Sequence, residues 1–366
     1  MVIGIDASRA AKKKRTGTEN YSYYLILHLL QLPTEARFVL YTKEKLPHEL
    51  RCLLSDRKLE RIVKGRFLWS QGALARAARS DKLDILFVPS HIVPFLYRRK
   101  TVVTVHGLEY EKTTDGYSFL DRLYMRLTTR FGARHSKSVI VPSEHTKKDL
   151  ESFYGVPQKK VSVIRHGSIA QEIEQAGASL SCFEKKRPYF FFIGRLEERK
   201  NIKRLLRAFF EIKKEIAYVN VQLILAGSKT DYFLRECSDL IESSKYASDV
   251  VARGYVSDKE YYCYLKKATA LVFPSLFEGF GMPVLDAQYL GVPVVTSKNS
   301  PMEEICERKC ALVAPFDIKS IKDGMKKVLD GKVYHNENGR RDALLFSWNE
   351  AAKETLDVLV EACSRK

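Results

Sequence analysis

Short apolar runs alternate with amphipathic segments along the whole chain. Apolar runs bounded by polar residues, Gly or Pro are typical of buried strands, and the segments between them have the three- and four-residue apolar spacing of helices. This alternation predicts an α/β protein with parallel sheets and helices on both faces. The strands expected in the first half are Val2–Ile5, Phe38–Tyr41, Leu59–Val63, Ile85–Val88, Val102–Val105, Ser138–Val141 and Val161–Ile164. The helices expected there are one that follows the loop Asp6–Thr18 and ends at Leu32, then Tyr117–Arg134 and Glu144–Tyr154.

The periodicity is lost between His166 and Arg187, where small and polar residues collect, and we interpret this segment as a linker. A second alternating series follows it, and the last segment, Ser347–Ser364, is helical. We therefore predict two domains, residues 1–168 and 169–346, and a C-terminal helix, residues 347–366. The second series contains strands Tyr189–Ile193, Val221–Ala226, Val250–Val251, Leu271–Phe273 and Val292–Val295, and helices Ile202–Ile216, Tyr232–Ser244, Asp258–Lys267 and Ile318–Leu329.

The stretch Leu271–Thr296 contains a strand, a loop, a helix and a second strand in succession. Gly279 and Gly281 in the loop allow backbone conformations and close ligand approaches that a Cβ atom would block. Pro283 suits the first helical turn, where its missing N–H costs nothing. The free N–H groups of that turn and the helix dipole predict a binding site for an anion such as phosphate.

Charged residues that suit a sugar diphosphate accompany this loop. Glu278 lies in the loop, and Asp286 follows it about two helical turns later. Two such carboxylates suit a ligand with hydroxyl groups on both sides of a phosphate, as in a nucleotide sugar. Arg195 and Lys200 follow another strand, where a guanidinium and an ammonium can both bind a diphosphate.

The first half offers weaker signals at the ends of its strands. His106 follows a strand directly and could hydrogen-bond a sugar hydroxyl, although a single histidine is more often structural. Gly17 precedes a helix whose first N–H groups could contact the diphosphate. The basic run Lys12–Arg15 suits a phosphorylated or lipid-linked acceptor, or is a solvated loop.

These residues resemble, in order, the motifs of the retaining family 4 glycosyltransferases. Glu278 and Asp286 are similar to the Glu–x7–Glu signature of that family, with Asp in the second position, and Gly194-Arg195 and Lys200-Asn201 resemble its phosphate-binding motif. The resemblance implies the GT-B fold: two Rossmann-like domains facing each other across a cleft, with a C-terminal helix that crosses back to the first domain. It also implies metal-independent transfer of a hexosyl group from a UDP- or GDP-sugar to a saccharide or lipid-linked acceptor, with retention of configuration.

The same resemblance assigns roles to individual residues. The catalytic set comprises His106, Arg195, Lys200 and Glu278, and the donor-binding set comprises Gly17, Gly194, Tyr255, Val256, Gly279, Phe280, Gly281, Met282 and Asp286. The acceptor is expected to meet Lys13, Lys14 and Arg15. No metal and no cofactor are implied, because the nucleotide sugar is a substrate. A non-catalytic nucleotide-sugar-binding protein of the same fold is the alternative, and Asp286 in place of Glu favours it.

The positive charge is concentrated in the first half of the chain. The formal net charge is +18, and residues 1–170 carry 31 Lys and Arg against 16 Asp and Glu, whereas residues 171–366 carry 31 against 28. Such a field favours an anionic partner such as a lipid surface or a phosphorylated acceptor, or it only promotes solubility. The helix Tyr117–Arg134 combines basic and apolar residues, as interfacial helices and many surface helices do. No motif for specific nucleic-acid recognition is visible.

Cysteines and apolar stretches predict the compartment. The chain begins without a basic n-region, and its longest apolar stretch, Tyr21–Leu30, is too short to span a bilayer. The seven cysteines form no CxxC pair and predict reduced thiols. We therefore expect a cytoplasmic protein, peripheral on the inner face of the membrane.

Overall fold

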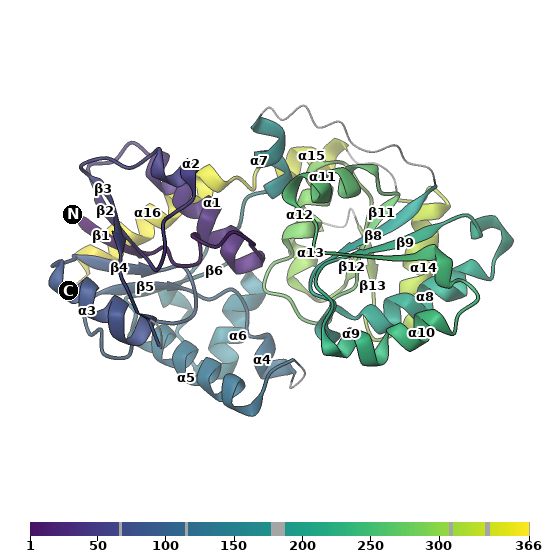
Figure 1. Ribbon diagram of the computed structural model, residues 1–366, viewed down its shortest axis with the longest axis horizontal. Coiled ribbons are helices and arrows are strands. Elements are labelled where there is room, and N and C mark those ends of the chain that lie inside the picture. Colours follow the sequence, from purple (N-terminus) through teal and green to yellow (C-terminus); the bar gives the residue numbers. More distant parts are fainter. Residues whose placement is uncertain (66–67, 114–115, 177–186, 307–309, 334–336, 366) are drawn as a thin grey trace. The chain divides into compact units, whose positions relative to one another are not determined.

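The computed structural model describes residues 1–65, 68–113, 116–176, 187–306, 310–333 and 337–365. The chain forms two compact units, Met1–Gly167 with Phe346–Lys366, and Ser168–Leu345 (Figure 1). Each unit has one parallel sheet with helices, so the predicted α/β class is confirmed.

The sheet of the first unit has the strand order β3-β2-β1-β4-β5-β6-β7. Its direction of growth reverses between β1 and β4, and ligands of such sheets bind where the order reverses, at the carboxyl ends of the strands. The strands are β1 (Val2–Asp6), β2 (Arg37–Thr42), β3 (Lys58–Ile62), β4 (Ile85–Val88), β5 (Thr101–Thr104), β6 (Ser138–Val141) and β7 (Val161–Val163). The α-helices are α1 (Gly17–Gln31), α2 (His48–Arg51), α3 (Ala75–Ser80), α4 (Glu109–Lys112), α5 (Phe119–His135), α6 (Glu144–Tyr154) and α16 (Trp348–Ser364).

The sheet of the second unit has the order β10-β9-β8-β11-β12-β13, which reverses between β8 and β11. The strands are β8 (Tyr189–Ile193), β9 (Gln222–Ala226), β10 (Val250–Gly254), β11 (Ala270–Phe273), β12 (Val294–Ser297) and β13 (Ala311–Val313). The α-helices are α7 (Ile169–Gln175), α8 (Ile202–Lys213), α9 (Asp231–Glu236), α10 (Ser238–Glu242), α11 (Asp258–Lys267), α12 (Met282–Tyr289), α13 (Pro301–Cys306), α14 (Ile318–Leu329) and α15 (Glu337–Ala343).

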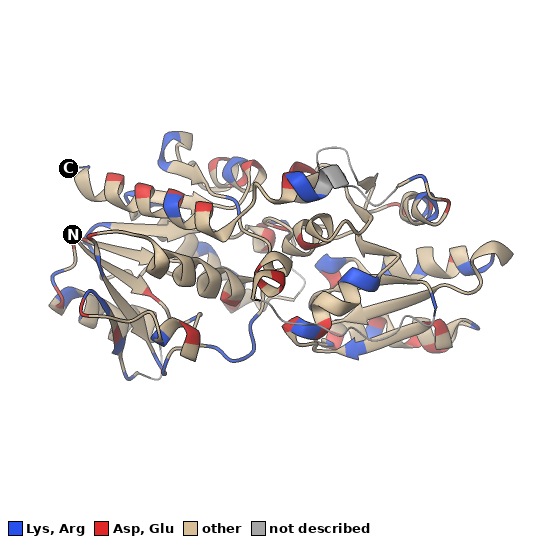
Figure 2. Cartoon of the chain, turned by 90° about the horizontal axis from the view of Figure 1, so that it is seen from above, with Lys and Arg blue, Asp and Glu red and all other residues tan. Residues whose placement is uncertain are grey.

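The central strands are buried on both faces, which explains their nearly continuous apolar sequences. All four residues of β4, β6 and β11 are buried. In Figure 2 the strands are largely tan, and most Lys, Arg, Asp and Glu residues lie on helices and loops. The hydrophobic pattern was therefore sufficient to locate these strands.

The C-terminal helix α16 packs on the first unit, against α1, as predicted. Trp348 at its start is completely buried and stacks on the rings of Tyr24 and His166. A Cβ atom at Gly167 would lie 2.3 Å from the backbone nitrogen of Trp348, so the glycine allows this close approach. The predicted return of the C-terminal helix to the first domain is confirmed.

Several elements differ from the predictions. The predicted linker contains the helix α7, and its residues 177–186 lie outside the described part of the chain. The helix predicted over Tyr232–Ser244 is two helices, α9 and α10, which meet at Cys237. The pattern also missed α13 and β13, because six- and three-residue elements are too short to show a period.

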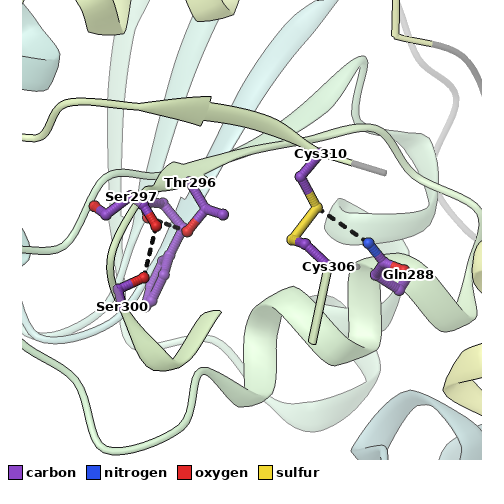
Figure 3. The surroundings of a disulfide bond; sticks show 7 residues. Gln288, Thr296, Ser297, Ser300, Cys306 and Cys310 are labelled. Atoms are coloured by element: carbon purple, nitrogen blue, oxygen red, sulfur yellow. Dashed lines mark hydrogen bonds between the residues drawn. A yellow bond between two sulfur atoms is a disulfide. The ribbon is translucent and has the colours of Figure 1, made fainter. Parts of the chain in front are cut away.

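The prediction of reduced thiols is wrong for three cysteines. Cys306, at the end of α13, forms a disulfide with Cys310, and Cys263 is also disulfide-bonded. Figure 3 shows the Cys306–Cys310 bond beside Gln288, whose Nε2 donates a hydrogen bond to the Cys310 sulfur at 3.1 Å. Cys52, Cys237 and Cys363 are free thiols, and Cys182 lies outside the described residues.

Within the described residues, no helix combines the length and the apolar character needed to cross a membrane.

Candidate functional site

Most of the predicted residues of the second half gather at one edge of the second sheet. Gly194 and Arg195 follow β8, and Glu278 lies in the loop after the neighbouring strand β11. Because β8 and β11 are the strands between which the sheet reverses, this edge has the position that ligands occupy in such folds.

Lys200 and Glu278 form a buried ion pair at this edge. Lys200 ends a short 3-10 turn, Glu198–Lys200, and its Nζ donates to the Glu278 carboxylate at 2.5 Å. Only about a tenth of each side chain is exposed, 10% and 11% respectively. Burial alone would raise the pKa of Glu278, but the charges of Lys200 and Arg199 hold that pKa below its usual value. Glu278 is therefore a carboxylate at neutral pH.

For Lys200, burial has a larger effect on the pKa than the oppositely charged partner has. Burial and the neighbouring Arg199 lower the pKa of Lys200, although Glu278 opposes the shift. The ammonium is held in place by its partner and by the Phe273 ring, whose centroid lies 5.0 Å from Nζ. A fixed, desolvated cation stabilises a developing negative charge more strongly than a mobile, hydrated one.

Arg199 belongs to the same cluster and was not predicted. Its guanidinium lies 3.4 Å from Glu278 and 2.7 Å from Glu197, so it links two carboxylates. Arg195 is 62% exposed and lies 3.6 Å from Glu197 at the other end of the cluster. The signal for Arg199 was its place directly before Lys200, but sequence spacing cannot show that both side chains contact Glu278.

The glycine-rich loop leads into α12 as predicted. Gly281 is the N-cap of α12 with φ of 117°, and a Cβ atom there would lie 2.6 Å from the side chain of Met302 on α13. Gly194 also has a positive φ of 145°. Met282 is the first residue of the helix, Gly279 is half-buried, and Phe280 is buried.

Asp286 lies inside the second unit, fully buried on α12. Its Oδ1 accepts hydrogen bonds from Ser168 Oγ at 2.7 Å and from the Ala170 N–H at 3.0 Å, and its Oδ2 accepts from Tyr261 at 2.7 Å. Burial raises the pKa of Asp286, although these hydrogen bonds counteract the shift. The carboxylate thus ties α12 to the start of α7 and to α11.

Tyr255 and Val256 follow β10 at the same edge of the sheet. Tyr255 is half exposed, and Val256 is buried. Gly254, before them, has a positive φ of 73°, and its carbonyl oxygen accepts from the Gly227 N–H. The turn therefore presents one exposed aromatic ring directly after β10.

In the first unit, His106 follows β5 and lies close to two other histidines, His91 and His166. Its Nε2 lies 3.0 Å from the carbonyl oxygen of Pro89, and because a carbonyl only accepts, Nε2 carries the proton. Burial lowers the pKa of His106 to about 3, so the ring is neutral and Nδ1 is an acceptor at pH 7. A neutral ring in this state can accept a hydrogen bond from a hydroxyl group.

The loop before α1 is organised by Glu19. Gly17 is the first residue of α1, after the N-cap Thr16, and Glu19 caps Thr16 in return. The Glu19 carboxylate also pairs with Arg9 at 2.8 Å and with Lys12 at 3.0 Å. Burial would raise the pKa of Glu19, but these partners lower it to about 2.

The three predicted acceptor residues lie beside this network. Lys13 and Lys14 are exposed, and the Arg15 guanidinium lies 4.0 Å from the centroid of the Tyr23 ring. The two lysines therefore face solvent, whereas Arg15 is half-buried against α1 and donates a hydrogen bond to Asn20.

Comparison with known proteins covers both units. Residues 15–168 match the family "Glycosyltransferase Family 4", and residues 181–343 match "Glycosyl transferases group 1". The O-antigen chain mannosyltransferase RfbU of Salmonella typhimurium is 26% identical over 65% of this chain, and the match spans 63% of that protein, less than two thirds of its length. The O-antigen chain mannosyltransferase B of Escherichia coli is 26% identical over 77% of this chain and 76% of its own.

A solved structure establishes the fold. The sucrose-phosphate synthase of Thermosynechococcus elongatus superimposes with a TM-score of 0.77 and 17% identity, covering 98% of each chain. Together with two parallel, Rossmann-like units and a C-terminal helix that returns to the first, this likeness identifies the GT-B fold.

Proposed function

Because the chain belongs to the group 1 (family 4) glycosyltransferases, we propose that it transfers a hexosyl group, with retention of configuration, from a nucleotide-diphosphate sugar to a saccharide or lipid-linked acceptor in surface-glycan synthesis. The observation that carries the proposal is the cluster of Lys200, Arg199 and Glu278, with Arg195 beside it, at the reversal point of the second sheet.

In the proposed reaction the bond between the anomeric carbon and the diphosphate oxygen breaks, and the acceptor oxygen bonds to that carbon on the same face. The acceptor proton passes to an oxygen of the departing diphosphate. Neutralising that diphosphate is the main electrostatic requirement, and Lys200 and Arg195 supply the cations. The metal independence of this step is part of the proposal.

The remaining residues position the donor. Glu278 accepts hydrogen bonds from hydroxyl groups of the donor sugar, and His106 accepts one through Nδ1. The first amides of α12, after Gly281, contact a phosphate, and Gly194, Gly279, Phe280 and Met282 line the same site. Gly17, in the first unit, contacts the diphosphate. Tyr255 and Val256 contact the base, and the contact of Asp286 with the ribose stays a prediction.

We propose GDP-mannose as the donor, because both O-antigen relatives are named mannosyltransferases. UDP-sugars are the alternative, since backbone contacts near Tyr255 and Val256 do not distinguish one base from another. The acceptor is expected to reach Lys13, Lys14 and Arg15 from solvent.

A donor panel tests the proposal. GDP-mannose, UDP-glucose and UDP-galactose are each added at increasing concentration, and thermal stability and release of the nucleoside diphosphate are measured. One donor should stabilise the protein, by about 2.7 kcal/mol at a hundred times its Kd, and should be slowly hydrolysed. Failure of every nucleotide sugar to stabilise the protein would refute the proposal.

A non-catalytic nucleotide-sugar-binding protein is the second candidate. Asp286, at the second acidic position of the signature, favours this candidate, because its carboxylate already accepts hydrogen bonds from Ser168 and Tyr261 of the protein itself. This candidate predicts stabilisation by a donor without hydrolysis, and without transfer to any acceptor in the presence of membranes.

A further inference from the structure

The helix α5 exposes four large apolar side chains and fully buries only small residues. Phe119 is 80% exposed, Leu120 73% and Leu127 53%, whereas the buried residues of the helix are Thr128, Thr129, Gly132 and Ala133. A helix of a soluble domain normally buries its apolar face, because each exposed apolar side chain forgoes about 1.5–3 kcal/mol of burial. The reversed pattern indicates that the outer face of α5 meets something other than water.

The exposed apolar residues form one line along the helix. Phe119, Leu120, Leu123 and Leu127 are exposed and follow one another after one, three and four residues, which places them on one face of the helix. At a rise of about 1.5 Å per residue, the line from Phe119 to Leu127 is roughly 12 Å long. In Figure 1 the helix lies along the lower edge of the first unit. We call this line the apolar stripe.

The apolar stripe ends beside a basic pocket. The Phe131 ring stacks on His135 at 4.1 Å, meets Phe95 edge-on at 4.8 Å, and lies 5.5 Å from the Arg98 guanidinium. His135 and Arg98 both line a pocket of about 500 Å³. The lining residues are Leu83, Asp84, Arg98, Arg99, Lys100, His135, Lys137 and Cys363.

Cations dominate this pocket. Its lining contains four cations, Arg98, Arg99, Lys100 and Lys137, and one carboxylate, Asp84. Asp84 already accepts a hydrogen bond from the Val2 N–H at 2.6 Å. Lys100 and Lys137 directly precede β5 and β6, so the pocket lies at the amino ends of these strands. His106 lies at their carboxyl ends, and the pocket is therefore separate from the candidate site.

We propose that the apolar stripe and the basic pocket form a docking surface for a bilayer that contains anionic phospholipids. The stripe lies at the boundary between head groups and acyl chains, and the pocket binds a lipid phosphate. Leucine and phenylalanine beside arginine and lysine are typical of interfacial helices, and each basic residue near an anionic surface contributes about 1 kcal/mol.

The charge of the first half favours an anionic bilayer over a second copy of the chain as the partner of this surface. Residues 1–170 carry a net charge of +15, so two copies of this surface repel each other, whereas an anionic bilayer attracts each one. None of these residues belongs to the candidate site, and the inference does not depend on the proposed function.

Vesicle sedimentation with the full chain tests the inference. We compare phosphatidylcholine vesicles with vesicles containing 3 parts in 10 of phosphatidylglycerol, in 0.15 M salt. The unmodified protein is expected to sediment with the anionic vesicles only. The variant Leu120→Ser/Leu123→Ser should lose at least tenfold in vesicle affinity, and Arg98→Ala/Arg99→Ala should lose a similar factor and much of the salt dependence.

Matched controls lie elsewhere on the surface. Ile216→Ser removes a 92% exposed apolar residue of the second unit, and Lys332→Ala/Lys353→Ala removes the same charge as the arginine variant. Both controls should bind vesicles like the unmodified protein, and all variants should keep its melting temperature because the residues are exposed. Equal binding by the Leu120→Ser/Leu123→Ser variant would overturn the proposal. Dimers in sedimentation velocity that this variant abolishes, without vesicle binding, would also overturn it.

Discussion

At the scale of single residues, the contact between Lys200 and Glu278 decides how the site works. Each is the main charged partner of the other, and both are nearly buried. A buried pair costs desolvation energy and therefore adds little stability, but it fixes the position of both charges. The ammonium is thus oriented before a donor arrives, and the carboxylate keeps Arg199 beside it.

We predict that Lys200→Ala slows transfer by roughly 30- to 900-fold, the equivalent of about 2–4 kcal/mol for one preorganised charge contact. The variant also leaves Glu278 buried without its main partner and should destabilise the second unit by about 3–5 kcal/mol. Initial rates at temperatures where the variant stays folded separate the two effects. Lys203→Ala is the control, because Lys203 pairs with Glu236 on the solvent side of α8. A folded Lys200→Ala variant with normal turnover would exclude Lys200 from the reaction.

The variant Asp286→Glu distinguishes a structural role of this carboxylate, as an acceptor of hydrogen bonds inside the second unit, from a contact with the donor ribose. The carboxylate is fully buried and accepts hydrogen bonds from Ser168, Ala170 and Tyr261, so the added methylene should destabilise the second unit by about 1–3 kcal/mol. Urea unfolding and donor titration measure both consequences. If Asp286 instead contacts the ribose, the glutamate that the family signature contains will bind the donor as well or better, with unchanged stability.

At the scale of elements, the packing of α16 on the first unit depends on a glycine, Gly167, which has no side chain to separate the two segments. Gly167 lies against the backbone of Trp348, and Trp348 is enclosed by Tyr24 and His166. The start of α16 therefore closes over the residue that ends the first continuous part of this unit.

We predict that Gly167→Ala destabilises the first unit by about 1–3 kcal/mol, because a Cβ atom 2.3 Å from the Trp348 nitrogen forces α16 to move. Hydrogen exchange should show faster exchange in α16 and little change in the second unit. Gly72→Ala is the matched control, since its Cβ atom would meet nothing within 4 Å. Protection of α16 that is unchanged in Gly167→Ala would contradict this account of the packing.

At the scale of the whole molecule, the two units should respond differently to acid. Every histidine of the sequence except His335 belongs to residues 1–167. Burial lowers the pKa of His91 to about 4 and that of His106 to about 3, and it lowers the pKa of His166 well below 6.5. In the unfolded chain these rings gain a proton near pH 6.5, while in the folded unit they stay neutral.

The stability of the first unit should therefore be constant above about pH 7 and fall as the pH drops from 6.5 towards 4, by about 1.4 kcal/mol per pH unit for each histidine. The pKa of Glu19 is lowered from 4.5 to about 2, so protonation of Glu19 reduces the stability of the first unit further only below about pH 4.5. Urea unfolding at pH 7, 6 and 5, followed by hydrogen exchange in each unit, measures the slopes. His91→Gln should reduce the slope and exposed His48→Gln should not; equal slopes in both units would contradict the assignment.

Much of the fold and part of the candidate site were predictable. The strands β4, β6 and β8 have the predicted bounds, because a strand that is buried along nearly its whole length leaves an almost continuous apolar run. Arg195, Lys200 and Glu278 were found because each follows a strand, and the carboxyl ends of parallel strands share one edge. The helix α7 was missed because its start is fixed by the N-cap Ser168 and by the distant Asp286 rather than by a long apolar period.

The sequence by itself determined the alternation of strands and helices, the family motifs and the excess of positive charge in the first half, since these depend on local periodicity and composition. Tertiary structure alone decided that Lys200 meets Glu278 across 78 residues, that Ser168 meets Asp286 across 118, and that the apolar stripe of α5 faces outwards. Such outcomes depend on which faces of distant segments pack together. A residue's neighbours along the chain constrain its backbone, but they do not specify its partners in space.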